Sequence, residues 1–209
     1  NITTSEFKRN HINKKNQILF HTINSNGIKE TENLINNFLI EKNSFIFESV
    51  EKGKIKGRYT IFGRNPSKIW EFNKGRCFEY NNKLKKKKIK GSPKENIERI
   101  IEHFKYKTPK ELPPISSLIS GYFSYDSIRY IEKIPNNCKN DLNLPDVRLM
   151  RPKTLVIHDN LKNEIFYIVN IFNDEKINNY QKKFGEIKSE LFKLRIQSSI
   201  KIFNKTQNK

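Results

Sequence analysis

The chain of 209 residues has few of the residues that build disulfide frameworks, metal sites or membrane spans. Its two cysteines, Cys77 and Cys138, lie far apart and form no Cys-x-x-Cys pattern, which excludes a disulfide framework and a zinc knuckle. Four scattered histidines form no His-Glu-x-x-His motif. No apolar run approaches the roughly 18 residues of a membrane span, and no signal-peptide pattern is present. We therefore expect a cytoplasmic protein with no metal site in this chain and no membrane partner.

Hydrophobic residues are also scarce, at 35% of the chain. Aromatic residues nevertheless reach 11%, with 15 Phe and 8 Tyr. Disordered chains are poor in aromatic residues, so disorder throughout is excluded. A chain of this length can bury about 70% of the surface that its unfolded form exposes. It therefore needs neither disulfides nor a metal to fold.

Acidic residues are few beside basic ones, because 41 Lys and Arg against 22 Asp and Glu give a net charge of +19. The functional explanation of this positive charge is a polyanionic partner such as nucleic acid. The compositional explanation is an A/T-rich genome, since the abundant Lys, Ile and Asn are all written with A/T-rich codons. Arg, which reads phosphates and guanine edges best, supplies only nine of the cations. We favour composition and expect no nucleic-acid partner; a Lys-rich nucleic-acid-binding module at residues 83–90 is the alternative of a different class.

Segments with β-rich composition predict a sheet of mainly antiparallel strands. The expected strands cover residues 16–23, 44–50, 58–62, 67–72, 76–80, 153–158 and 164–171. Several are joined by short turns, such as Asn73-Lys74-Gly75, which indicates hairpins. The lysine run at 83–90 is explained either as a solvated loop or as an edge strand that its charges protect from pairing.

Four segments have helical features. Apolar residues recur at helical spacing after Gly27, and Ser92 with Glu95 forms a capping box at the start of a second helix. Asp126 is the expected N-cap of a short helix. Residues 174–196 place apolar side chains at spacings of three and four, which predicts a long amphipathic helix.

These elements together predict an α+β fold. We expect a mainly antiparallel β-sheet in a two-sheet, sandwich-like arrangement with flanking helices. The length fits one domain, because domains usually hold roughly 100–200 residues. That domain is expected to cover residues 1–197, with a polar tail or linker at 198–209.

No catalytic constellation emerges from the residue pattern, so we predict no catalytic residue in this chain. Glycines such as Gly53 and Gly57 lack the strand–turn–helix context and the Lys-Ser/Thr ending of a phosphate loop. Two segments, 45–63 and 121–132, are half-polar and rich in aromatic residues. Such segments suit either a small amphipathic ligand or a satisfied polar network, and the pattern alone leaves both open.

Three separated motifs carry a family resemblance. They are F-I-F-E-S-V-E-x-G-x-x-x-G-R-Y-T-I-F-G-x-x-P at 45–66, G-Y-F-S-Y-D-S-I-R-Y-I-E-K-I-P at 121–135 and L-P-D-V-R-L-M-R-P-K-T-L-V-I-H-D-N at 144–160. In this order they resemble the N-terminal domain of anthranilate synthase component I, over about residues 16–171. Aminodeoxychorismate synthase component I is the alternative within the family. The Y-D-x-I-R-Y-x-E form and Arg151-Pro152 look more like the anthranilate branch.

The resemblance implies a part of a lyase of tryptophan biosynthesis. The full protein would convert chorismate and ammonia or glutamine into anthranilate and pyruvate, together with a glutamine amidotransferase subunit (component II). The family's Mg²⁺ and catalytic residues belong to a C-terminal chorismate-binding domain that this chain does not contain. We therefore expect no cofactor in this chain, no activity from it alone, and a tail that leads toward the missing domain.

The resemblance also implies allosteric feedback inhibition by L-tryptophan. In the family, a Glu-Ser pair lines the tryptophan pocket. This pair corresponds to Glu48 and Ser49 of the present chain, with Phe47 beside them. Arg58 and Tyr59 on the partner strand are expected to supply a cation and an aromatic wall. Ser49 is the central residue of this hypothesis, because a small hydroxyl can bond the ligand without filling an apolar slot.

Overall fold

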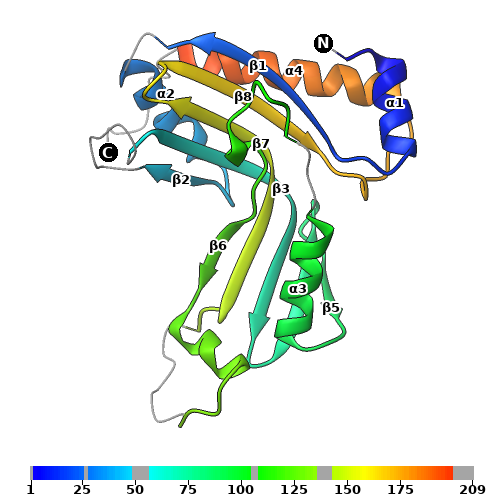
Figure 1. Cartoon of the computed structure of the whole chain (residues 1–209), viewed down its shortest axis with the longest axis vertical. Coiled ribbons are helices and arrows are strands. Elements are labelled where there is room, and N and C mark those ends of the chain that lie inside the picture. The colour runs from blue at the N-terminus through cyan, green and yellow to red at the C-terminus, as the bar shows by residue number, and fades with distance from the viewer. Residues whose placement is uncertain (1, 26–27, 49–56, 105–107, 136–142, 200–209) are drawn as a thin grey trace, which may run out of the picture. The chain divides into compact units, whose positions relative to one another are not determined.

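The computed structural model describes residues 2–25, 28–48, 57–104, 108–135 and 143–199 (Figure 1). Ser49 and Cys138 lie outside the described residues. The helices are α1 (Thr4–Ile12), α2 (Ile28–Phe38), α3 (Pro93–His103) and α4 (Tyr180–Ser199), with 3₁₀ turns η1 (Pro114–Ser116) and η2 (Tyr125–Tyr130). The strands are β1 (Gln17–Asn24), β2 (Phe45–Glu48), β3 (Tyr59–Asn73), β4 (Arg76–Asn81), β5 (Lys86–Ile89), β6 (Ser120–Phe123), β7 (Val147–Asp159) and β8 (Glu164–Ile171).

The strands are hydrogen-bonded into one sheet of order β1-β8-β7-β3-β4-β5, with β2 paired to β3 and β6 paired to β7. The pairs β1·β8, β7·β8, β2·β3, β3·β4, β4·β5 and β6·β7 are all antiparallel. The predicted α+β class, antiparallel pairing and flanking helices are confirmed. The strands are linked through β3 and β7 into a single sheet, where the sequence suggested two.

The chain divides into two compact units. Unit 1 comprises Asn1–Asn65, Lys107–Ser117 and Lys153–Lys209, and unit 2 comprises Pro66–Tyr106 and Leu118–Pro152. Both β3 and β7 contribute residues to each unit. Each unit has apolar clusters of its own.

Unit 1 is built on β1, β8 and the second half of β7. The helix α4 crosses one face of these strands, with α1 and α2 packed against it (Figure 1). Because side chains alternate along a strand, Ile165 and Tyr167 of β8 both face this helical layer. The largest cluster contains Leu34, Phe38, Phe62, Val156, Ile165, Tyr167 and Leu194. A second cluster lies under α1 and joins Phe7, Leu19, Val169, Ile171, Phe184 and Ile187.

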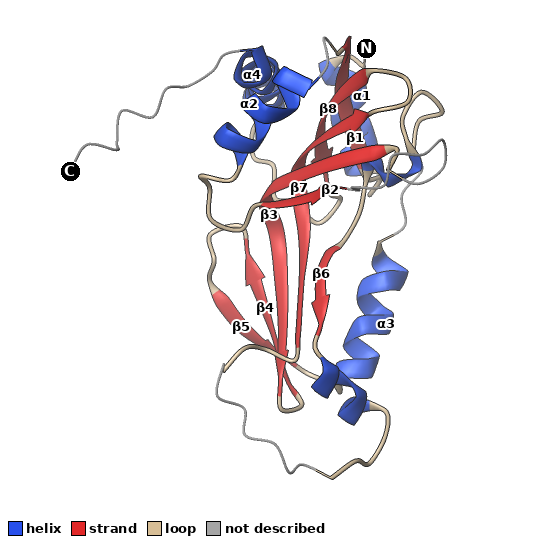
Figure 2. Ribbon diagram, turned by 90° about the vertical axis from the view of Figure 1, so that its left-hand side faces the viewer, coloured by secondary structure: helices blue, strands red, loops and turns tan. Residues whose placement is uncertain are grey.

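Unit 2 contains the rest of β3, the hairpin β4–β5, β6 and the first half of β7. The helix α3 lies along these strands (Figure 2) and begins with the predicted capping box. The Ser92 amide donates to Glu95 at 2.7 Å, and the Glu95 amide donates to the Ser92 hydroxyl at 3.3 Å. The core of this unit contains Trp70, Phe72, Cys77, Val147 and Leu149.

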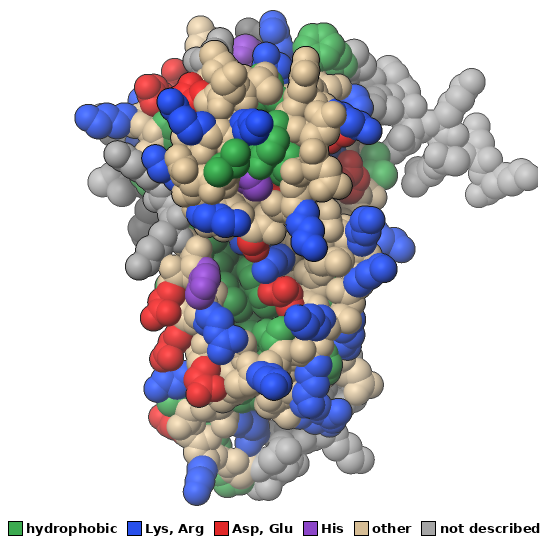
Figure 3. All heavy atoms as spheres, turned by 90° about the vertical axis from the view of Figure 1, so that its right-hand side faces the viewer, with side chains coloured by type: hydrophobic (Ala, Val, Ile, Leu, Met, Phe, Trp, Pro, Cys, Tyr) green, Lys and Arg blue, Asp and Glu red, His purple; other side chains and the backbone are tan. Residues whose placement is uncertain are grey.

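The lysine run forms the edge strand β5, which is one of the two placements expected for it. Lys86, Lys87 and Lys88 are all exposed, and β5 is the last strand in the sheet order. Figure 3 shows Lys and Arg side chains distributed over much of the face that it draws. On that face the positive charge is spread out and not gathered into one patch.

Four local expectations differ from the structure. β3 is one strand and not two, because it continues through Asn65 with a positive φ of 52° and through Pro66. The long helix begins at Tyr180 and not at residue 174, because the Asn179 side chain caps it by accepting from the Lys182 amide at 2.9 Å. The N-cap of η2 is Ser124, where Asp126 was expected. The helix α1 was not predicted at all. No helix within the described ranges is long and apolar enough to cross a membrane.

The packing of unit 1 predicts a large cost for Phe62→Ala. The Phe62 ring is fully buried and meets the Phe38 ring edge-on at 5.9 Å. Its removal should lower the free energy of unfolding by about 3–5 kcal/mol, because a cavity replaces a core ring. Urea denaturation measures this loss. Phe192→Ala, which removes a ring that is 62% exposed, is the matched control; equal losses in both variants would contradict the assigned core.

Candidate functional site

The residues of the first motif lie at the adjacent ends of two paired strands. Phe47 and Glu48 end β2, and they pair with Ile61 and Thr60 of β3. The Phe47 ring is 46% exposed and lies 4.7 Å from the Phe45 ring, centroid to centroid, while Ile46 packs against the core, so successive side chains of β2 point to opposite faces. Glu48 is exposed. This strand end therefore presents an aromatic ring and a carboxylate to solvent.

Arg58 and Tyr59 lie at the start of β3, beside this strand end. The Arg58 guanidinium lies over the Tyr59 ring at 4.8 Å from its centroid. It is also hydrogen-bonded to the Asp159 carboxylate. The Arg58 Nε donates to both carboxylate oxygens at 3.1 Å, and Nη2 donates to Oδ2 at 2.7 Å. Phe47 and Glu48 therefore lie at the end of β2, Tyr59 begins the neighbouring strand β3, and Arg58 directly precedes that strand.

The turn between β7 and β8 is hydrogen-bonded to the residues at the start of β3. Besides its bonds to Arg58, the Asp159 carboxylate accepts from the turn amides of Leu161 at 3.1 Å and Lys162 at 3.2 Å. The Asn160 amide donates to the Arg58 carbonyl at 2.7 Å, and the Asn160 side chain donates to the Gly57 carbonyl at 3.2 Å. The start of β3 is therefore held by both backbone and side-chain bonds.

The electrostatics of this cluster follow from the buried carboxylate. Only 1% of the Asp159 side chain is exposed, against 32% of the Arg58 side chain. Burial by itself raises the pKa of Asp159, but the bond from Arg58 and the two turn amides outweigh burial and hold that pKa below its ordinary value. Burial raises the pKa of Tyr59, and the nearby Asp159 charge raises it further.

By the register of the two strands, Phe47 and Tyr59 share one face and Glu48 points to the other, while the Arg58 guanidinium lies over the Tyr59 ring. Arg58 with these two rings can bind an anion and pack against a flat apolar group. Arg58 has five N–H donors, of which the bonds to Asp159 use the Nε–H and one on Nη2. The remaining donors have no bond to another residue in the part of the chain that the structure describes, so they can bind a carboxylate, and Tyr59 and Phe47 offer aromatic faces. Glu48 could accept from an ammonium group. Among the described residues no group of three or more His, Cys, Asp or Glu side chains could hold a metal ion.

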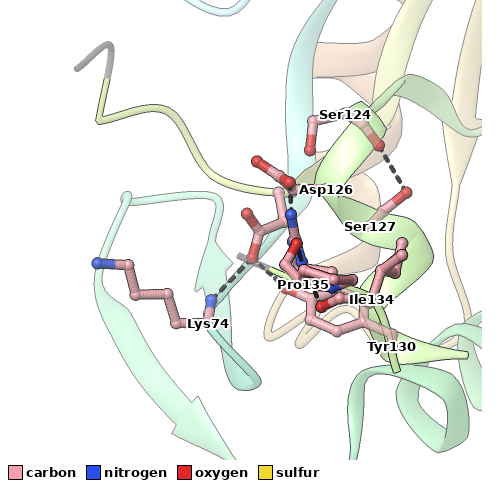
Figure 4. A network of polar contacts seen from close by, with 9 residues as sticks. Lys74, Ser124, Asp126, Ser127, Tyr130, Ile134 and Pro135 are labelled. Carbon is pink, nitrogen blue, oxygen red and sulfur yellow. Dashed lines mark hydrogen bonds and ion pairs between the residues drawn. The ribbon is translucent and has the colours of Figure 1, made fainter. Parts of the chain in front are cut away.

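The second motif forms a polar network of its own in unit 2 (Figure 4). The Tyr130 hydroxyl donates to Asp146 Oδ2 at 2.5 Å, and the Lys74 amide donates to the same oxygen at 2.8 Å. Burial and this hydrogen bond raise the pKa of Tyr130. Arg129 pairs with Asp126 at 2.9 Å and donates to two main-chain carbonyls that follow η2.

Sequence reasoning missed the residues that hold these segments in place. Asp159 and Asn160 end the third motif, and Asp146 lies near its start, but each fixes a segment far away in the sequence. The motif itself was the only signal, because hydrogen bonds across about a hundred residues leave no local pattern. Ser49, the central residue of the ligand hypothesis, lies outside the described residues.

The lowered pKa of Asp159 predicts an acid-sensitive contribution to stability. Asp159→Asn should lower the free energy of unfolding near neutral pH by about 2 kcal/mol, the scale of a hydrogen bond to a charged group. A carboxyl whose folded pKa is depressed stabilises the fold above its unfolded pKa, and that stability is lost as the pH falls through the folded pKa. The difference between wild type and Asp159→Asn should therefore shrink below the ordinary aspartate pKa. Urea denaturation across acidic pH measures it.

The control for this measurement is Glu132→Gln, which neutralises an exposed carboxylate. Its effect on unfolding should be small at every pH, because an exposed charge interacts weakly with its surroundings. A stability difference for Asp159→Asn that stays constant from neutral to strongly acidic pH would refute the assignment.

Comparison with known proteins identifies relatives of this chain. No family model matches it. Anthranilate synthase component 1 of Cereibacter sphaeroides is 34% identical over 127 residues, which cover 58% of this chain and 25% of that protein. The protein of the same name from Acetivibrio thermocellus is 35% identical over 127 residues, covering 61% and 26%. That from Pseudomonas aeruginosa is 30% identical over 164 residues, covering 73% and 32%.

A solved structure shares the fold. The crystal structure of anthranilate synthase component I from Streptococcus pneumoniae matches with a TM-score of 0.51 and 21% identity, covering 73% of this chain and 32% of that one. At this identity the match supports the fold alone. The chain spans about a quarter to a third of the length of the relatives that it matches. The chain is therefore a relative of part of anthranilate synthase component I.

Proposed function

We propose that the chain is the N-terminal, tryptophan-sensing portion of anthranilate synthase component I. The observation that carries this proposal is the partial match: 30–35% identity over most of this chain, but over only 25–32% of each relative. The whole protein would be a lyase of tryptophan biosynthesis that converts chorismate and ammonia or glutamine into anthranilate and pyruvate. A cytoplasmic location belongs to the same proposal.

The remaining parts of the enzyme follow from the same proposal. A C-terminal chorismate-binding domain would supply the catalytic residues and the Mg²⁺, and a glutamine amidotransferase subunit would supply ammonia. The absence of a metal-binding group from the described residues is compatible with this division but does not test it. On this account the 209 residues alone form no anthranilate.

The proposed tryptophan site consists of Phe47, Glu48, Ser49, Arg58 and Tyr59. Its support is the placement of four of them on the adjacent ends of β2 and β3. Free tryptophan carries an ammonium, a carboxylate and an indole ring, which Glu48, Arg58 and the aromatic side chains complement in turn. Ser49 would bond the ligand at the centre of the slot.

Two alternatives have weaker support. The branch of aminodeoxychorismate synthase shares the motifs, but the relatives described above carry the name anthranilate synthase. A nucleic-acid-binding module would use the exposed lysines of β5. Such a module predicts an affinity for DNA or RNA that falls steeply with salt, because binding releases counterions. Filter binding at two salt concentrations separates it from the enzyme.

The proposal predicts that this chain can replace the matching part of a relative. A chimera would carry this chain in place of the corresponding residues of the Acetivibrio thermocellus enzyme. We expect it to form anthranilate from chorismate, seen by anthranilate fluorescence, and to be inhibited by L-tryptophan. The 209-residue chain alone should form none. A folded chimera without activity, or activity of the isolated chain, would count against the proposal.

In the same chimera, Ser49→Phe should abolish tryptophan inhibition while turnover stays largely intact. The reason is steric, because the ring would occupy the slot that the ligand needs. The matched control is Ser5→Phe, which adds the same ring at an exposed position of α1. If the Ser49→Phe chimera is still inhibited at the same tryptophan concentration as the chimera without this substitution, the assignment of this site is ruled out.

A further inference from the structure

Unit 2 contains a cavity of ligand size, distant in sequence from the proposed tryptophan site. It lies between α3 and the segment of β6 and η2 and has a volume of about 420 Å³. Small-molecule sites usually measure about 300–1,000 Å³. Its lining residues are Lys94, Ile97, Glu98, Phe123, Ser127, Ile128, Tyr130 and Ile131.

The walls of this cavity are apolar and unusually exposed. Phe123 is 55% exposed and Ile131 is 75% exposed. Large apolar side chains that gather around a hollow at the surface mark a binding site, since leaving them in water is unfavourable.

The η2 wall is fixed before any ligand arrives. The Tyr130 ring packs against the core of unit 2, and its hydroxyl is bonded to Asp146 (Figure 4). The Ser127 hydroxyl donates to the Ser124 carbonyl at 2.7 Å, and the Ser124 amide donates to the Asp146 carbonyl at 2.8 Å. A preorganised wall reduces the entropy that a ligand loses on binding.

The mouth of the cavity carries one charge of each sign. Lys94 and Glu98 are exposed and lie one turn apart on α3, so they share a face of the helix. No ion pair or hydrogen bond joins the side chain of either residue to another residue in the part of the chain that the structure describes. Both charges are therefore available to a ligand.

We propose that this cavity binds a small zwitterion with an apolar side chain, that is, a free amino acid such as phenylalanine. The side chain would enter between Ile97, Ile128 and Ile131. Its carboxylate would meet Lys94, and its ammonium would meet Glu98. This site is separate from the proposed tryptophan site, which uses no residue of α3 or η2.

The test is calorimetric titration of the 209-residue chain with L-phenylalanine and two analogues. Phenylalaninamide lacks the carboxylate, and N-acetyl-phenylalanine lacks the ammonium. In the wild type each analogue should bind about tenfold more weakly than phenylalanine. In Lys94→Gln, phenylalanine and phenylalaninamide should bind equally, because the partner of the carboxylate is gone. In Glu98→Gln, phenylalanine and N-acetyl-phenylalanine should bind with equal affinity, because the partner of the ammonium is gone.

Two further variants complete the experiment. Ile131→Ser removes an apolar wall that is too exposed to support the fold, and it should weaken phenylalanine binding about tenfold. Lys88→Gln removes an exposed lysine of β5 and should change nothing. The proposal is overturned if phenylalanine up to about 10 mM gives no binding heat, or if Lys94→Gln keeps the wild-type preference for phenylalanine over its amide. Either failure leaves tryptophan inhibition through Ser49 untouched, so the two proposals fail independently.

Discussion

The buried carboxylate of Asp159 is the constraint on which the first motif depends. A carboxylate removed from water is costly unless donors surround it. Here Arg58 and the two turn amides satisfy it. Because Arg58 opens β3 and Asp159 ends β7, this single charge joins segments about a hundred residues apart. It fixes the backbone on which Tyr59 and the end of β2 are placed.

In the proposed tryptophan site, the residue that supports Arg58 is distinct from the residues that would contact the ligand. Asp159 holds the guanidinium of Arg58 in one orientation, and 32% of the Arg58 side chain remains exposed. An arginine with a fixed plane binds a carboxylate with less loss of side-chain entropy than a free one. Unit 2 uses the same principle, since Asp146 fixes Tyr130 and the 3₁₀ turn that carries it. In both units a buried acidic side chain positions an aromatic segment of a family motif.

Much of the fold could be predicted from local pattern. The capping box at Ser92, the β3–β4 turn and the β7–β8 hairpin each depend on neighbouring residues, and the structure has all three. Errors arose where a residue's role depends on distant partners or fine backbone geometry. The strands expected separately at 58–62 and 67–72 form one strand through Pro66, and the helix expected from residue 174 begins at Tyr180, because the Asn179 side chain caps it. The candidate site came from the family resemblance, whereas its supports at Asp159 and Asn160 required the structure.

The central claim is that L-tryptophan binds where β2 ends and β3 begins. Hydrogen–deuterium exchange of the chimera, with and without L-tryptophan, tests it most directly. The account predicts slower exchange in peptides that contain Phe47 and Glu48 and in those that contain Arg58 and Tyr59. Unchanged exchange in both sets of peptides, at a tryptophan concentration that inhibits the enzyme, would contradict it.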